Sequence, residues 1–190
     1  MGCAICDELP DSLTVQTGYG DTLPSASGRL TEITSDSRAA LRECPACPAV
    51  FVWEDHPQFF GSGNLDEETL ERLGAAQSEL VRAFAHGPDP AGRAREIFAT
   101  LKRPALDLLL DHLLWRRKDV FRELLPLLLD ELERAPGPPQ ALGFTWLQDL
   151  ITTWAGCGAE QARSVLSGLE GRSGWHVDTV TRTLRARGPR

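Results

Sequence analysis

The sequence predicts an α+β protein that is mostly α-helical, with a small zinc-bound β module at its N-terminal end. Two Cys-x-x-Cys pairs lie within the first 47 residues, and short apolar segments there are separated by turn-forming residues in the manner of β-strands. From about residue 64 onwards, apolar residues recur at helical spacing instead. We therefore expect two domains packed on each other: a zinc-binding β module at residues 1–63 and an α-helical domain at residues 64–190.

Three short segments of the first domain are candidates for β-strands. Residues 13–19 alternate Leu, Val and Thr in a strand-like way, residues 30–33 are a second candidate, and residues 50–53 are a third. Residues 21–28 sustain no period, which predicts a hairpin loop or a mobile tip. So small a module buries little apolar surface, and we expect a bound metal to stabilise it.

Seven helices are predicted for the second domain. Asn64 or Asp66 can cap the first, whose opening turn carries Glu67 and Glu68 beside the positive end of the helix dipole. This helix should end near His86, which Gly and Pro follow. The other six are expected at residues 93–101, 104–115, 119–134, 138–155, 160–169 and 175–187.

The last four predicted helices form two pairs that are offset by about 40 residues, which is the period of paired-helix solenoids. Within them, residues 123–132 (Glu-Leu-Leu-Pro-Leu-Leu-Leu-Asp-Glu-Leu) resemble the first helix of a HEAT repeat, including the interior Pro126. The resemblance implies a short HEAT-like α-solenoid. An irregular helical bundle would give much the same leucine pattern, so both architectures stay open.

The two Cys-x-x-Cys pairs consist of Cys3, Cys6, Cys44 and Cys47. A tight turn with thiolates at positions i and i+3 directs both sulfurs to one point, and two such turns complete the tetrahedral shell that zinc prefers. Disulfides would suit an exported chain, and a redox pair would suit the start of a helix in a βαβ unit, but the sequence gives neither context. These cysteines therefore predict one structural Zn²⁺, with iron as the less favoured metal.

The segment that begins at Cys44 reads Cys-Pro-Ala-Cys-Pro-Ala-Val-Phe-Val-Trp, and it resembles the second knuckle and strand of a zinc ribbon or rubredoxin-like module. The resemblance covers residues 1–56 at most, and it implies a β-hairpin that leaves the knuckle. Pro48 stands where such ribbons commonly have Gly, so one backbone N–H donor to a cysteine sulfur is expected to be missing. His56 is a further candidate ligand, although a lone His beside a knuckle is more often a surface or packing residue.

The charge and hydropathy of the chain narrow the classes of function. The net charge of −7 is concentrated at the metal-bearing end, since residues 1–65 hold three Arg and nine Asp or Glu. Such a surface repels a phosphate backbone, so we do not expect nucleic-acid binding. No apolar run reaches the ~20 residues of a membrane span, and no signal peptide is apparent, which predicts a cytoplasmic protein. Arg outnumbers Lys 18 to 2, which is typical of GC-rich bacterial coding.

The predicted zinc site is closed, because four thiolates leave no position for a water molecule. The sequence also lacks a phosphate loop, a nucleophile elbow and a His-Glu-x-x-His motif. We therefore expect a non-enzymatic, zinc-stabilised adaptor whose helical body binds a protein partner. One alternative is a bacterial toxin-neutralising immunity protein, for which a compact acidic helical protein would be suitable. A second alternative is a nucleic-acid-binding zinc-ribbon protein that uses the basic segment 182–190.

Overall fold

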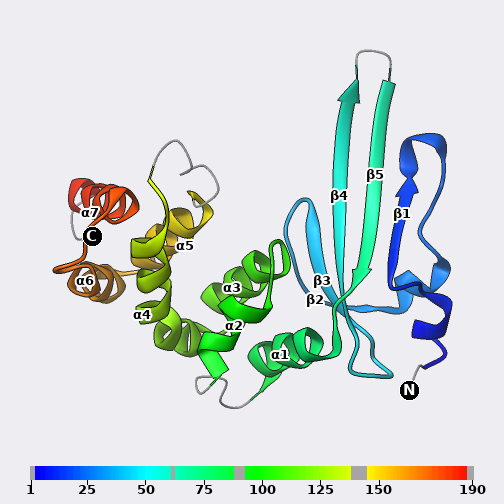
Figure 1. The fold of residues 1–190 in the computed structure, drawn as a ribbon, viewed down its shortest axis with the longest axis horizontal. Helices are drawn as coiled ribbons and strands as arrows, with labels where there is room; N and C mark the ends of the chain where they lie inside the picture. The colour runs from blue at the N-terminus through cyan, green and yellow to red at the C-terminus, as the bar shows by residue number, and fades with distance from the viewer. Residues whose placement is uncertain (1–2, 61–62, 88–92, 138–144, 188–190) are drawn as a thin grey trace. The chain divides into compact units, whose positions relative to one another are not determined.

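A computed structural model describes residues 3–60, 63–87, 93–137 and 145–187 (Figure 1). These residues form an antiparallel sheet of five strands, seven α-helices and three short 3-10 helices. The predicted α+β fold class with a mostly helical chain is therefore confirmed. The chain divides into two compact units, residues 1–113 and residues 114–190.

The first unit is built around the sheet, whose strand order is β1-β5-β4-β3-β2. The strands are β1 (Ser12–Gln16), β2 (Thr31–Ser35), β3 (Ala39–Glu43), β4 (Val50–Phe60) and β5 (Gly63–Arg72). Strands β2 to β5 follow one another as a meander, and β4 and β5 form a hairpin longer than the neighbouring strands (Figure 1). Strand β1 pairs with the other edge of β5, so β1 and β2 lie at opposite edges of the sheet.

The connection between these two edges packs against the core. It contains the 3-10 helices η2 (Thr17–Tyr19) and η3 (Ser25–Arg29), and Ala26 and Ser27 in η3 are buried. The prediction of a hairpin loop or mobile tip at residues 21–28 is therefore wrong. The connection has to cross the sheet from edge to edge, and its small side chains let it lie close to the apolar residues beneath it.

Strand β5 occupies residues that the sequence predicted to be helical. The helix expected to start at Asn64 or Asp66 begins only at the first residue of α1 (Ala75–His86). Strand β5 pairs with β4 over its whole length and with β1 over residues 67–71, so its backbone bonds to strands on both sides. This pairing outweighs the helix-forming tendency of the local residues. The domain boundary predicted after residue 63 falls where β5 begins, and the sheet includes strands from both sides of it.

Helix α1 is anchored to the end of the sheet at which β4 begins. The backbone N–H of Val50 donates to the hydroxyl oxygen of Ser78 over 3.2 Å, and that hydroxyl donates to the carbonyl of Leu73 over 3.1 Å. Arg82 forms an ion pair with Glu43 of β3 at 2.6 Å. The buried Ser78 thus has partners for both its donor and its acceptor, which keeps α1 close to the start of β4.

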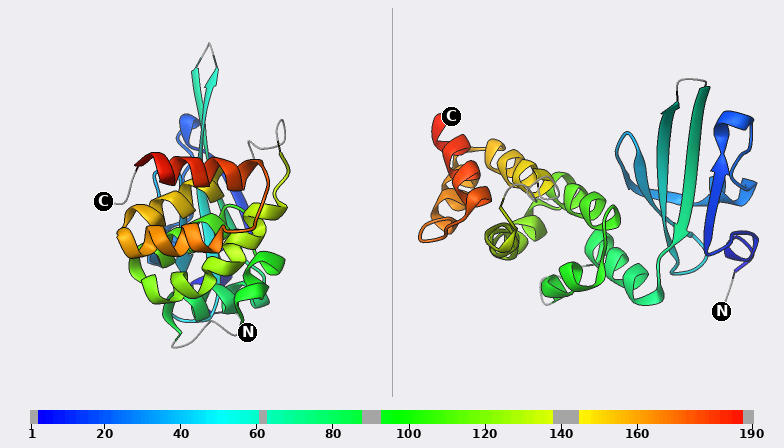
Figure 2. Two further views of the ribbon diagram at one scale, coloured as in Figure 1. Left: turned by 90° about the vertical axis from the view of Figure 1, so that its left-hand side faces the viewer. Right: turned by 45° about the horizontal axis from the view of Figure 1, so that its top comes forward.

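The remaining helices are α2 (Ala94–Thr100), α3 (Ala105–Arg116), α4 (Lys118–Arg134), α5 (Thr145–Gly156), α6 (Ala159–Gly168) and α7 (Trp175–Arg187). Each lies within its predicted range or within one or two residues of it, and the first part of the predicted helix at 138–155 falls on residues 138–144, outside the described ranges. In the second unit each of α4, α5, α6 and α7 contacts the other three (Figure 2). The rings of Phe121 and Trp154 lie 5.0 Å apart in this helical core, and Pro126 lies inside α4 as predicted.

Within the described residues, no helix combines the length and the apolar character needed to cross a bilayer. The helical body is confirmed, whereas its likeness to a HEAT solenoid stays a prediction.

Candidate metal centre

The two cysteine pairs meet because of the strand order of the sheet. The first pair precedes β1, and the second lies in the turn between β3 and β4. Strands β1 and β4 are both antiparallel to β5, which lies between them, so they run in the same direction and start at the same end of the sheet. At this end, Ser12 of β1 is opposite Glu71 of β5, and Phe51 of β4 is opposite Arg72. The topology therefore carries both pairs to one place.

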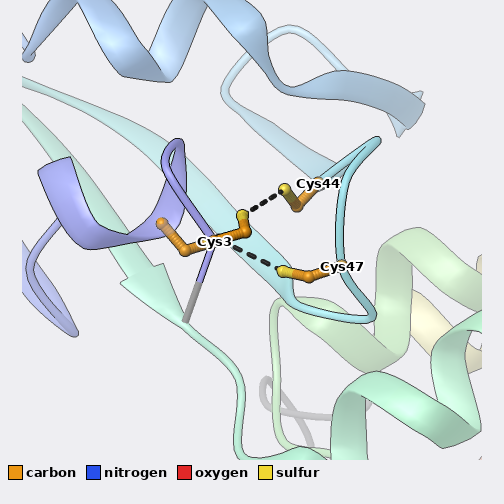
Figure 3. A group of neighbouring side chains, drawn as sticks. Cys3, Cys44 and Cys47 are labelled. Atoms are coloured by element: carbon orange, nitrogen blue, oxygen red, sulfur yellow. Dashed lines mark hydrogen bonds between the residues drawn. The ribbon is translucent and has the colours of Figure 1, made fainter. Parts of the chain in front are cut away.

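The sulfur atoms of Cys3, Cys6, Cys44 and Cys47 all lie within 4.8 Å of one another. The Sγ atoms of Cys3 and Cys44 are 3.5 Å apart (Figure 3). Those of Cys6 and Cys47 are 3.4 Å apart. Four sulfurs bonded to a central zinc at about 2.3 Å would have tetrahedral edges of about 3.8 Å. A disulfide bond is much shorter, at about 2.0 Å. The four cysteines thus form a group that could hold a metal ion, as the sequence predicted.

The first pair is shaped by a short turn that continues into η1 (Cys6–Glu8). The N–H of Asp7 donates to the carbonyl of Cys3 over 2.9 Å, and the N–H of Leu9 donates to the carbonyl of Cys6 over 3.2 Å. A hydrogen bond from the backbone N–H of Cys6 lowers the pKa of the Cys3 thiol to about 6, against the opposing effect of burial. The turn therefore presents one sulfur that readily becomes a thiolate.

The second pair lies in a turn closed by the Cys44 N–H, which donates to the carbonyl of Ala49 over 2.9 Å. The N–H of Ala46 donates to the sulfur of Cys44 over 3.4 Å, and Pro48, which has no N–H, can supply no such bond. Burial raises the pKa of the Cys44 thiol, and it raises the pKa of the Cys6 thiol as well. Two of the four thiols therefore hold their protons firmly until a cation replaces them.

Arg72, the last residue of β5, fastens the first pair to the sheet. One nitrogen of its guanidinium, Nη2, donates to the carbonyl of Cys6 over 2.6 Å and to the carbonyl of Leu9 over 2.9 Å. The other terminal nitrogen, Nη1, lies 3.1 Å from the carboxylate of Asp11, and the guanidinium carbon lies 5.3 Å from the centre of the Phe51 ring. Arg72 cannot be recognised from the sequence, because its partners are mainly backbone carbonyls and these leave no side-chain motif.

The cysteines belong to an apolar cluster at the end of the sheet. Cys6 and Cys44 are buried at 4% and 1% exposure, and Cys3 and Cys47 are partly buried beside them. The other buried members of the cluster are Leu9, Ala26, Phe51 and Leu70. Trp53 also packs against it, and its indole N–H donates to Glu68 over 3.0 Å. A metal held by these sulfurs would have apolar side chains around it, which strengthens its electrostatic attraction to the thiolates.

The other candidate ligands lie apart from this group. His56 is on β4 with its side chain 46% exposed, and its Nε2 atom is 3.9 Å from the carboxylate of Glu54. Cys157 is exposed near the end of α5, where its thiol donates to the carbonyl of Thr153 over 3.5 Å. Among the residues that the structure describes, only the four cysteines form a group of three or more metal-ligating side chains.

Comparison with protein-family models, with curated proteins and with solved structures finds no match for this chain. The resemblances to a zinc ribbon and to HEAT repeats therefore stay predictions.

Proposed function

We propose that the four cysteines bind one Zn²⁺ and that the protein is a non-enzymatic, zinc-stabilised adaptor. The observation that carries the proposal is the convergence of four thiols, from two segments 41 residues apart, to within 4.8 Å of one another. Soft sulfur donors favour zinc over the oxygen-seeking Mg²⁺ and Ca²⁺. Four thiolates fill the tetrahedral shell and leave no place for water or substrate, so the role we propose for the metal is structural.

The proposed structural role is to join the segment before β1 to the turn between β3 and β4. These two segments contact each other through their sulfurs and through the apolar cluster around them. A zinc ion would replace the sulfur-to-sulfur contacts with four bonds, and its binding free energy would add to the stability of this end of the sheet. The module would then be a rigid support for the surfaces that bind a partner.

Exposed aromatic side chains support a protein partner. Trp115, in the last turn of α3, is 51% exposed, and Trp175, the first residue of α7, is 44% exposed. Tyr19 in η2 is 76% exposed. Trp and Tyr are enriched among the residues that contribute most binding free energy at protein interfaces. We therefore propose that the partner contacts the helical body at one or both tryptophans.

The charge of the β4–β5 hairpin supports a protein partner over a nucleic acid. Residues 54–68 include five Asp or Glu and no Lys or Arg. Asp55 and Glu68 are directly opposite each other in the pairing of β4 with β5, which places two like charges side by side. A phosphate backbone would meet electrostatic repulsion at this surface.

Elemental mass spectrometry of the purified protein, combined with a thiol count after denaturation and chelation, tests the metal assignment. We expect one zinc per chain and five reactive thiols, which is the full cysteine content. Detection of iron in place of zinc would change the identity of the metal but not the closed, four-cysteine character of the site. Absence of any metal, or disulfides within the group, would overturn the zinc proposal.

The adaptor proposal is tested with Trp175→Ala and with a control on the same helix, Arg182→Ala. Chemical crosslinking in cells followed by mass spectrometry should identify a specific protein that binds the wild type and the control, and the purified pair should reassemble. Trp175→Ala should weaken that binding by about 2 kcal/mol or more if Trp175 is a central contact. Failure to find any reproducible protein partner, together with retention on DNA at low salt, would favour the nucleic-acid alternative.

A further inference from the structure

Arg72 contacts the first cysteine pair entirely through atoms that a metal would not use. Its guanidinium binds the carbonyl oxygens of Cys6 and Leu9 and the carboxylate of Asp11, and none of these contacts involves a sulfur. The backbone N–H of Arg72 also donates to the carbonyl of Asp11 over 2.8 Å. These bonds can therefore form before a metal binds, whereas bonds between sulfur and metal cannot.

The place of Arg72 in the sheet explains why this residue can hold the knuckle. It is opposite Phe51, the second residue of β4, and it follows Glu71, which is opposite the first residue of β1. The side chain thus lies between the starts of the two strands that the cysteine pairs precede. The planar guanidinium can bind two carbonyls and a carboxylate at once while one face lies against the Phe51 ring, at 5.3 Å from its centre.

We propose that Arg72 is a positioning residue for the metal site. It holds Cys3 and Cys6 opposite Cys44 and Cys47 independently of the metal, so that zinc meets a partly formed shell. The proposal rests on the zinc binding proposed above and adds the residue that prepares the site. Without the guanidinium, the segment from Cys3 to Leu9 would have to be ordered at the moment of metal binding, and the cost of that ordering would lower the affinity.

Arg42 offers a matched control for substitution of Arg72. It is opposite Phe51 on the other side of β4, and its guanidinium carbon lies 5.1 Å from the centre of the Trp53 ring. Both arginines thus flank Phe51 and stack on an aromatic ring, but the described hydrogen bonds to the first cysteine pair come from Arg72. Loss of Arg42 should therefore affect local packing without releasing that pair.

The first measurement is the zinc affinity of wild type, Arg72→Gln, Arg72→Lys and Arg42→Gln by competition with a chelating dye. Residues that support metal ligands typically change affinity by about 10–100-fold, and we expect a loss of that size for Arg72→Gln. Arg72→Lys should keep part of the affinity that Arg72→Gln loses, because an ammonium can bind one carbonyl but cannot reach both carbonyls and the carboxylate at once. Arg42→Gln should stay within about threefold of wild type. Equal affinities for Arg72→Gln and Arg42→Gln would overturn the proposal.

The second measurement is hydrogen exchange at the amides of Asp7 and Leu9 in the metal-free proteins. These N–H groups bond within the first knuckle, so their protection reports whether it is ordered. We expect protection in wild type and Arg42→Gln, and exchange at least about tenfold faster in Arg72→Gln, which corresponds to 1.4 kcal/mol.

If Arg72→Gln fails to fold, the metal-free wild type is compared with a free peptide of residues 3–11. Exchange as fast as in the peptide would show that Arg72 does not order the knuckle, and slower exchange would support the proposal. A wild type that binds neither Zn²⁺ nor Co²⁺ would overturn the proposed zinc site, while the exchange comparison would still decide whether Arg72 holds the segment.

Discussion

The affinity of the four-cysteine site for zinc should depend steeply on pH, and the slope of log affinity against pH should change near pH 6. Zinc binds thiolates, so every thiol that is protonated in the metal-free protein releases a proton on binding. Burial raises the pKa of Cys6 and of Cys44 above the ordinary value of 9.0, so both are protonated at pH 7. Zinc binding at pH 7 should therefore release at least two protons. Lowering the pH by one unit should then weaken binding by at least about 100-fold, which corresponds to at least about 2.7 kcal/mol.

Cys3 should change the slope below neutrality. The hydrogen bond from the Cys6 N–H lowers the pKa of Cys3 to about 6, so this residue is mostly a thiolate at pH 7 and adds little to the proton release there. At pH 5 it is mostly protonated and adds nearly one further proton. The slope of log affinity against pH should consequently be steeper by about one below pH 6 than above pH 7.

Isothermal titration calorimetry at pH 7 in two buffers of different ionisation enthalpy counts the released protons directly. Competition with a chelating dye between pH 5 and pH 8 then measures the slope, after correction for the titration of the dye. Cys157→Ser is the control, because this exposed thiol lies apart from the site and its loss should leave the slope unchanged. Release of clearly fewer than two protons at pH 7 would refute the burial argument, and a constant slope across pH 6 would refute the assignment to Cys3.

Two further predictions concern the second unit. Gly168→Ala should destabilise the protein by about 1–3 kcal/mol in urea unfolding, because a Cβ there would lie 2.5 Å from Cδ1 of the buried Leu129. In a double-mutant cycle, Leu129→Ala should remove that penalty. Simple additivity of the two substitutions would contradict the steric explanation. Gln148→Ala should lower the free energy of unfolding by about 1–3 kcal/mol, because it removes the amide that donates to Nδ1 of the buried His176. The control Asp149→Ala, on the exposed side of α5, should change it by less than about 0.5 kcal/mol. Equal effects of the two substitutions would show that the buried hydrogen bond is unimportant.

The features predicted well from sequence are those that depend on local patterns. The two Cys-x-x-Cys pairs identify their own members, because a tight turn brings the two sulfurs of each pair together whatever the rest of the fold does. The helices of the second unit are likewise readable, since leucines such as Leu124 and Leu128 recur at helical spacing and are buried in α4. The sequence also suggested that the two pairs share a site, and the geometry of the four sulfurs agrees.

The features predicted poorly depend on strand pairing. Strand β5 contains Asp66, Glu67 and Glu68, which favour the first turn of a helix, and Leu70 is its one fully buried described residue. Only pairing with β1 and β4 makes this segment a strand, and no local pattern reports such pairing. Strand β3, which reads Ala-Ala-Leu-Arg-Glu, was missed for the same reason. The role of Arg72 depends on this pairing too, so it could not be read from the sequence.

The position of β5 between β1 and β4 also sets an order of events during synthesis of the chain. When Cys47 has been added, all four ligands exist, but the strand that separates the two cysteine pairs has not yet been made. Strands β1 and β4 share no hydrogen bonds, so they acquire a fixed spacing only when β5 inserts between them. A nascent chain that ends between Cys47 and Arg72 therefore carries all four thiols but not yet the complete strand that fixes their spacing. Metal captured at that stage would be held by ligands whose spacing is not yet fixed, so a chelator should remove it more readily than after β5 has formed.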